Sequence, residues 1–302
     1  MKILLTGKNG QLGQALQTRL RGLVGLGDGL GDGLVEVLAV DRTQMDLSNP
    51  DSCRAVMQSF QPDLVINAAA YTAVDKAEQE EALAFAVNAE APKVLAEEAV
   101  KLGAALIHYS TDYVFDGSKQ GAWTEDDEPH PLSVYGRSKL AGEQAITASG
   151  VPHFIFRTSW VYSLVGQNFL LTMLRLAKDR KELSIVADQH GAPTWTHTIA
   201  DATVRVIQQL QQQGKLTEQI QKSGGIYHLV AGEQTTWFGF AQSIFAHHSV
   251  LNKPQLHAIT TEQYPLPAPR PKNSVLSTKK FQQQFFALPS WQQALKDCQD
   301  DL

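Results

Sequence analysis

Cysteine is scarce in this chain of 302 residues, which contains only Cys53 and Cys298. Two cysteines are too few for a disulfide framework, and this pair lacks the close spacing of metal ligands. Disulfide-rich sequences are typical of oxidising compartments. We therefore expect a reducing, cytoplasmic setting and no metal site.

Long apolar runs and clusters of basic residues are also missing. The first apolar run, Ile3 to Leu5, is shorter than the roughly 7–15 residues of a signal peptide, and no window supplies the roughly 20 apolar residues of a membrane-spanning helix. Lysine and arginine total 26 against 31 aspartates and glutamates, a net charge of −5. We therefore expect a soluble protein that binds neither a membrane nor nucleic acid.

The composition that remains is that of an ordinary globular protein, with 43% hydrophobic and 19% charged residues. Predicted strands alternate with helices along the first half of the chain, which indicates a parallel sheet covered on both faces. We predict an α/β fold: a Rossmann-like doubly wound parallel sheet with a smaller C-terminal α/β substrate domain. The expected strands are 2–6, 35–40, 63–67, 105–109 and 153–157, and the expected helices include 84–102, 133–149, 168–178, 197–212, 237–245 and 291–300.

The looser pattern of the second half predicts two domains. Residues 1–160 would form a dinucleotide-binding domain, and 161–302 would mainly bind substrate, with some elements packing back on the first domain. A low-complexity segment from Gly22 to Gly33 repeats Leu-Gly-Asp-Gly. Its glycines predict a flexible surface loop without a chemical role.

Three glycines, Gly7, Gly10 and Gly13, lie between the first predicted strand and a helix. This is the context that a dinucleotide-binding fingerprint requires. The first glycine permits a tight turn, the second lets the backbone approach the pyrophosphate, and the third lets the helix pack close to the strand. The helix N-terminus then offers N–H groups and partial positive charge to phosphates. The pattern, here G-x-x-G-x-x-G, predicts a dinucleotide cofactor.

The end of the second predicted strand bears on the choice of cofactor. Asp41 is placed to accept a hydrogen bond from the adenosine ribose, and a free 2′-hydroxyl there indicates NAD(H). Arg42, its neighbour, could pair with the 2′-phosphate of NADP(H). Because the two residues favour different cofactors, the sequence leaves NADPH and NADH both open.

A candidate catalytic group follows from Tyr135 and Lys139, which form Tyr-x-x-x-Lys on a predicted helix. Residues four apart share a helix face, and an ammonium near a phenol favours phenolate and lowers its pKa. We therefore expect Tyr135 to act in general acid–base chemistry. Thr111 ends the fourth predicted strand, at the sheet edge where open α/β sheets bind ligands, and offers a hydroxyl to a substrate oxygen.

These motifs resemble the extended short-chain dehydrogenase/reductase superfamily. A finer set of motifs resembles its dTDP-4-dehydrorhamnose reductase family. The finer motifs are Tyr109-Ser-Thr-Asp-Tyr-Val-Phe115, Arg157-Thr-Ser-Trp-Val-Tyr162, Asp188-Gln-His-Gly-Ala-Pro193 and Arg270-Pro-Lys-Asn-Ser-Val-Leu276. They occur in the expected order over nearly the whole chain.

The resemblance implies NAD(P)H-dependent reduction of the C4 ketone of dTDP-4-dehydro-L-rhamnose to dTDP-L-rhamnose. Tyr135 would donate the proton, Lys139 would lower the pKa of Tyr135 and hold the nicotinamide ribose, and Thr111 would bond the substrate oxygen. The expected cofactor-binding residues are Gly7, Gly10, Gln11, Leu12, Gly13, Asp41, Arg42, Asp46, Leu47, Ala68, Ala69, Ala70, Tyr109, Tyr135 and Lys139. The expected substrate-binding residues are Thr111, Asp112, Trp160, Asn168 and Arg270.

The same resemblance bears on related activities. Nucleotide-sugar dehydratases of the superfamily carry Thr-Asp-Glu where this chain has Thr111-Asp112-Tyr113, so elimination lacks its base. An epimerase shares Tyr-x-x-x-Lys, although the motifs of the second half do not favour one. A non-catalytic alternative stays open: a cofactor-binding regulatory subunit resembling that of methionine adenosyltransferase.

Some family members use Mg²⁺ at a dimer contact built from acidic side chains. The corresponding regions here, Gln14-Ala15 and 194–197, contain no carboxylate, and neutral side chains such as that of Ala15 cannot bind a hard cation. We therefore expect no metal-linked dimer, and we leave a monomer or a homodimer open.

Overall fold

The computed structural model describes residues 1–24, 35–247 and 253–302. Gly22 lies in the first helix, whereas the rest of the glycine-rich repeat, 25–33, falls outside the described residues, so the expected surface loop is not tested. Within the described ranges, we find no helix long and apolar enough to span a membrane.

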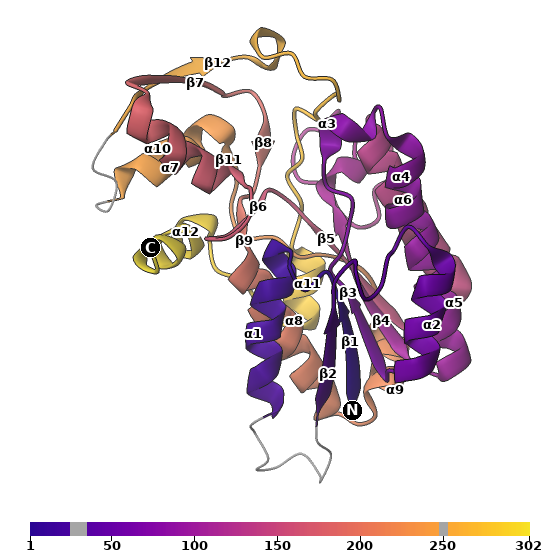
Figure 1. The fold of residues 1–302 in the computed structure, drawn as a ribbon. Helices are drawn as coiled ribbons and strands as arrows, with labels where there is room; N and C mark the ends of the chain where they lie inside the picture. The colour runs from indigo at the N-terminus through magenta and orange to yellow at the C-terminus, as the bar shows by residue number, and fades with distance from the viewer. Residues whose placement is uncertain (25–34, 248–252) are drawn as a thin grey trace.

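A six-stranded parallel sheet forms the centre of the fold (Figure 1), in the order β10-β5-β4-β3-β1-β2. Its strands are β1 Lys2–Thr6, β2 Glu36–Val40, β3 Leu64–Asn67, β4 Ala105–Thr111, β5 His153–Thr158 and β10 Gly225–His228. The order reverses at β1, which has β2 on one side and β3 on the other. In open α/β sheets ligands bind at the carboxyl ends of the strands beside such a reversal.

Helices cover both faces of the sheet, because successive strand residues point to opposite sides. On one face Leu4, Val65 and Ile155 pack against α2 Pro50–Phe60, α5 Ala91–Leu102 and α6 Val134–Ser149. On the other face Leu5, Ile66 and Phe156 pack against α1 Gln11–Val24, α8 Thr196–Gln211, α9 Leu216–Ser223 and α11 Lys279–Gln284. The predicted doubly wound α/β fold is confirmed.

A second lobe with its own apolar core lies beyond the carboxyl ends of the strands (Figure 1). Its elements are β6 Val161–Tyr162, β7 Glu182–Val186, β8 His190–Gly191, β9 Thr194–Trp195, β11 Thr235–Thr236, β12 Gln255–Ile259, α7 Phe169–Asp179, α10 Trp237–Ala246 and α12 Trp291–Asp300. Strand β10 and helices α8, α9 and α11 follow residue 160 but pack with the first core. The assignment of 1–160 to cofactor and 161–302 to substrate stays a prediction.

Helix starts follow the capping signals of the sequence. The Asn49 side chain accepts hydrogen bonds from the N–H groups of Asp51 and Ser52, and Pro50 opens α2.

One expected helix is interrupted: residues 84–102 divide into α4 Glu81–Phe85, a π-helical turn Ala86–Glu90, and α5. A short helix, α3 Val74–Ala77, precedes them. In the π turn the buried Asn88 amide bonds both backbone groups of Tyr71, a tertiary contact that local periodicity does not reveal.

Candidate active site

The predicted glycine loop forms a tight backbone cradle between β1 and α1. Gly7 has φ +75°, and a Cβ there would lie 2.9 Å from the backbone of Ala69. A Cβ on Gly13 would lie 2.0 Å from the carbonyl oxygen of Gly7. A side chain on Gly7 would clash with the segment that follows β3, and one on Gly13 would push α1 away from the loop, which explains why both positions are glycine. The cradle leaves the N-terminus of α1 open for an anionic group.

A cavity of about 710 Å³, here called the central cavity, opens beside this loop. It lies at the carboxyl ends of β1, β3 and β4, where the order of the sheet reverses. Most of the predicted site residues meet there: Gly7, Gly10, Gln11, Leu12, Ala68, Ala69, Ala70, Tyr109, Thr111, Asp112, Tyr135, Lys139 and Trp160. The folding of the chain thus brings the predicted cofactor and catalytic residues to one place.

A smaller cavity of about 450 Å³ lies at the end of β2, and the residues that line it include Asp41, Arg42, Asp46 and Leu47. The Asp41 carboxylate lies 3.0 Å from Nζ of Lys8. A hydrogen bond from the Thr43 hydroxyl, helped by Lys8, holds the pKa of Asp41 well below its usual value. Lys8 is a cation that sequence reasoning missed, and it adds to Arg42 as a group that could face a phosphate.

The first turn of α6 carries Tyr135. Ser133 caps this helix by accepting a hydrogen bond from Gly136 N–H, at 3.2 Å. The Thr111 hydroxyl donates to Asp112 Oδ1 at 3.1 Å and accepts from Tyr113 N–H at 3.1 Å. Thr111 and Tyr135 both line the central cavity.

Lys139 is turned differently from what the sequence predicts. Its Nζ donates to the carbonyl oxygen of Tyr109 at 2.7 Å and lies 3.0 Å from Nε2 of His108. Burial raises the pKa of Tyr135 to about 12, and the group that opposes this rise is the Thr111 hydroxyl. Lys139 is not among the groups that shift the pKa of Tyr135 in the chain by itself, and its expected effect on that pKa stays a prediction. Burial lowers the pKa of Lys139 to about 8.

Several buried polar atoms at the central cavity have no partner within the described part of the chain. They include Oδ2 of Asp112, Oγ of Ser110 and Oγ1 of Thr158. Burial raises the pKa of Asp112 to about 7, although the hydroxyl groups of Ser274 and Thr111 lower it. Because buried polar groups are nearly always satisfied, these atoms mark where a polar ligand can bond.

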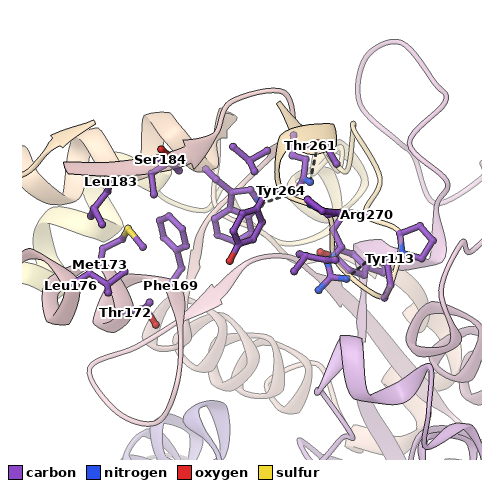
Figure 2. Close-up of a pocket in the computed structure, with 18 residues that line it drawn as sticks. Tyr113, Phe169, Thr172, Met173, Leu176, Leu183, Ser184, Thr261, Tyr264 and Arg270 are labelled. Carbon is purple, nitrogen blue, oxygen red and sulfur yellow. Dashed lines mark hydrogen bonds between the residues drawn. The ribbon is translucent and has the colours of Figure 1, made fainter. Parts of the chain in front are cut away.

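A third cavity of about 550 Å³, here called the side cavity, lies between the lobes. Figure 2 shows apolar side chains such as Met173 and Leu183 at one end of it and Arg270 with Tyr113 at the other. The Arg270 guanidinium makes two hydrogen bonds to the carboxylate of Asp75, at 2.7 and 2.8 Å. Arg270 therefore borders this cavity in a fixed orientation.

Trp237 was not among the site residues predicted from the sequence. It stacks on Trp160 and borders both the central and the side cavities. Asn168, a predicted substrate residue, is not among the described residues that line the three cavities. Its amide caps α7 and donates to Oε1 of Gln11 at 2.8 Å. Asn168 thereby ties α7 to the glycine loop, and its contact with substrate stays a prediction.

Metal binding finds no support among the described residues, where no group of three His, Cys, Asp or Glu side chains is arranged to hold an ion. The expected absence of a metal-linked dimer stays a prediction, since it concerns a second subunit.

The fold and the glycine cradle define a Rossmann-like nucleotide-binding protein with a Tyr-x-x-x-Lys helix. A family model described as the RmlD substrate binding domain matches residues 1–302. The chain is 43% identical, over 100% of its length and 99% of the relative's, to a dTDP-4-dehydrorhamnose reductase of Burkholderia thailandensis. The chain therefore belongs to the dTDP-4-dehydrorhamnose reductase family, and the resemblance drawn from its motifs is confirmed.

Solved structures agree with this assignment. A dTDP-4-dehydrorhamnose reductase from Clostridium acetobutylicum superposes with a TM-score of 0.87 at 37% identity, covering 99% of each chain. One from Bacillus anthracis, in complex with NADP, superposes with a TM-score of 0.86 at 34% identity, covering 100% of this chain and 99% of that one.

Proposed function

We propose that this chain reduces the C4 ketone of dTDP-4-dehydro-L-rhamnose to dTDP-L-rhamnose with NADPH or NADH. The observation that carries the proposal is the meeting of Tyr135, Thr111 and Lys139 with the glycine loop at one cavity. It is supported by the full-length identity to dTDP-4-dehydrorhamnose reductases.

The residues present fit a dinucleotide. A Cβ on Gly7 or Gly13 would clash with the neighbouring backbone, so the lack of a side chain at these two positions keeps the space beside α1 open. The backbone of Gly10 and Gln11 would hold the pyrophosphate, and Asp41 the adenosine ribose. The relative from Bacillus anthracis binds NADP. Because Lys8 and Arg42 stand beside Asp41, we propose that either nicotinamide cofactor can be accepted.

The side cavity fits the nucleotide half of the substrate. Arg270 presents a guanidinium, which pairs with phosphate oxygens through parallel hydrogen bonds. The apolar end, with Met173, Leu176 and Leu183, suits the flat face of a base. The diphosphate would lie near Arg270 and the sugar would reach past Trp237 into the central cavity.

The chemistry follows from the groups at the central cavity. The bound nicotinamide supplies a hydride to C4 of the sugar. Tyr135 would donate its phenolic proton to the C4 oxygen. The Thr111 hydroxyl, whose single hydrogen bonds Asp112 Oδ1 in the free chain, would turn to donate to the same oxygen. Oδ2 of Asp112, which lacks a partner among the described residues, can accept a hydrogen bond from a hydroxyl of the sugar. Lys139 would hold the nicotinamide ribose with its ammonium.

We place the reaction in the cytoplasm, in keeping with Cys53 and Cys298, which are buried and free. A monomer or a homodimer fits the proposal. The sugar nucleotide is the partner that it requires.

Turnover with each cofactor tests the proposal. Purified protein is mixed with dTDP-4-dehydro-L-rhamnose and NADPH or NADH, and the loss of nicotinamide absorbance is followed. The product is then identified by NMR as dTDP-L-rhamnose. Saturable cofactor binding without turnover would overturn the proposal in favour of a regulatory subunit, and a product that keeps its ketone would indicate an epimerase.

A further inference from the structure

A chain of buried hydrogen bonds runs through the sheet beneath the central cavity. Thr6 Oγ1 donates to Oδ1 of Asn67 at 2.6 Å, and the Asn67 amide lies 3.0 Å from Nδ1 of His108. Nε2 of His108 then lies 3.0 Å from Nζ of Lys139. The relative exposure of each of these four side chains is at most 1%.

This series of hydrogen bonds follows the register of the sheet. Thr6 pairs with Asn67 across β1 and β3, and Asn67 pairs with His108 across β3 and β4. The three side chains therefore form one row across neighbouring strands, and Lys139 reaches the end of the row from α6. Thr6 Oγ1 also accepts from Ala69 N–H at 3.3 Å, which ties the row to the loop that borders the cofactor cavities.

Lys139 has one donor left for the cavity. An ammonium carries three N–H donors and no acceptor. One of them bonds the carbonyl oxygen of Tyr109, and a second faces His108. The third is available on the side where Lys139 borders the central cavity. The geometry thus directs a single N–H toward the ligand.

We propose that His108 is a positioning residue for Lys139: as a neutral imidazole it accepts a hydrogen bond from the ammonium and thereby holds both its charge and its direction. This inference deepens the proposed function and rests on it. His108 is not among the described residues that line the three cavities, so it acts through Lys139 alone.

The surroundings keep His108 neutral. Burial, the charge of Lys139 and that of His153 on β5 hold the pKa of His108 well below its usual value. Glu143, on α6 with Lys139, favours the ammonium and is itself paired with Arg157 of β5 at 2.7 Å. Tyr135 and Tyr109 are the other titratable groups at Lys139. A neutral acceptor supports the ammonium without adding a second charge.

The proposal predicts the tautomer of His108. If Nε2 accepts from Lys139, Nδ1 carries the proton and donates to the Asn67 amide oxygen. This requires the Asn67 amide to be rotated by half a turn from the orientation described above, so that its oxygen faces His108 and its NH₂ faces Thr6. When Lys139 loses its proton, the opposite arrangement is consistent: Nε2–H donates to the neutral amine and Nδ1 accepts from Asn67. The two states differ by one proton, released to solvent.

The pH profile of kcat/KM for ketone reduction tests the role in catalysis. Its alkaline limb in wild type should fall near pH 8, where Lys139 loses its proton. In His108→Leu the limb should move down by about one to two pH units, the effect of one hydrogen bond to a charged group. His108→Gln keeps an acceptor and should restore most of the shift. His153→Gln is the control. Burial lowers the pKa of His153, so near pH 8 it carries no charge that acts on His108, and this variant should leave the limb unchanged.

A second measurement needs no substrate. Nitrogen-15 NMR of histidine-labelled protein reports which ring nitrogen of His108 carries the proton. We expect Nδ1–H below about pH 8, a change toward Nε2–H above it, and no such change in Lys139→Met. The inference would be overturned if the alkaline limb of folded His108→Leu stayed at the wild-type pH. It would also be overturned if Nε2 of His108 carried the proton at neutral pH. If neither the wild type nor any variant reduces the ketone, the proposed function fails. The NMR titration still decides whether the protonated ring nitrogen of His108 changes when Lys139 loses its proton.

Discussion

Trp160 and Trp237 stack face to face, with ring centroids 3.7 Å apart and planes 9° from parallel. Trp160 follows β5, whereas Trp237 begins α10 in the second lobe. Trp160 has φ 45°, in the left-handed region that bulky residues rarely adopt. Gly191 makes room for it, because a Cβ there would lie 2.5 Å from the Trp160 ring. The stack thus holds a strained residue where the central and side cavities meet.

Trp237→Ala should raise KM for the sugar nucleotide while changing the cofactor Kd little. Aromatic pairs contribute about 0.5–1.5 kcal/mol beyond burial, so a rise of roughly 2- to 12-fold is expected from the freed Trp160. Steady-state kinetics at saturating cofactor measure it. Trp237→Phe keeps a ring on Trp160 and should lie close to wild type. An unchanged KM in Trp237→Ala would separate the stack from substrate binding.

Tyr135→Phe should lower kcat by about 10²–10⁴-fold, the range of general acid catalysis, with the cofactor Kd little changed. The phenol acts on the transferred proton, whereas the nucleotide is held elsewhere. Single-turnover kinetics and a cofactor titration check both parts. Tyr113→Phe is a matched control, since Tyr113 lies edge-on to Tyr135 with centroids 5.9 Å apart and its hydroxyl faces Arg270. A Tyr135→Phe variant with more than half the wild-type kcat would remove Tyr135 from the reaction.

The parts of this site that local sequence determines could be predicted. Gly7 and Gly13 follow from the strand–turn–helix pattern, and Tyr135 with Lys139 from helical spacing. The α2 cap follows from Asn49 and Pro50. Each of these rests on residues a few positions apart, where backbone geometry decides which side chains meet.

The rest depends on contacts between distant segments. His108 reaches Lys139 only because β4 lies beneath α6, 31 positions away. Trp237 reaches Trp160 only once the second lobe has folded onto the first. Strands β7 and β12 pair although Glu182 and Gln255 are far apart in sequence. The sequence pattern of a strand does not reveal which other strand it pairs with. The raised pKa of Tyr135 has the same origin, because its main cause is burial by segments that are distant in sequence.

Asp41→Ala should shift preference toward NADPH. Its carboxylate repels a 2′-phosphate and occupies Lys8 at 3.0 Å, so its removal frees one cation beside Arg42. The quantity to compare is the ratio of kcat/KM for NADPH and NADH. Asp51→Ala is the control, because Asp51 pairs with Arg54 on the exposed side of α2. An unchanged ratio in Asp41→Ala would show that Asp41 does not face the adenosine ribose.

Asp112→Asn should change how stability depends on pH. Burial raises the pKa of Asp112 to about 7 in the folded chain, above the ordinary value of 3.8. Between these values the folded state holds a proton that the unfolded state has lost, so rising pH destabilises wild type by up to about 1.4 kcal/mol per pH unit. Asparagine does not titrate. Urea unfolding at pH 5 and 7 should show the variant gaining relative to wild type at the higher pH, and a constant difference would contradict the raised pKa.

Arg270→Ala should raise KM for the sugar nucleotide far more than it lowers kcat. The guanidinium is held by Asp75 at the mouth of the side cavity, remote from C4, so its contact with the diphosphate should be equal in ground and transition states and appear in KM. Hydrogen bonds to charged groups contribute about 1.5–3 kcal/mol, or roughly 10- to 150-fold. Lost stability does not account for such a rise, because Asp75 is 39% exposed and a partly exposed ion pair contributes about 1 kcal/mol or less.

Arg270→Lys separates charge from geometry. Lysine keeps the positive charge but presents it as a point rather than a planar fork. If Arg270 binds the diphosphate through two parallel hydrogen bonds, lysine should recover only part of the lost affinity, and KM should lie between those of wild type and Arg270→Ala. Full recovery would mean that charge alone matters at this position. A KM within twofold of wild type in Arg270→Ala would place Arg270 outside the binding site. Its role would then be the contact with Asp75, which joins the segment 264–271 to α3.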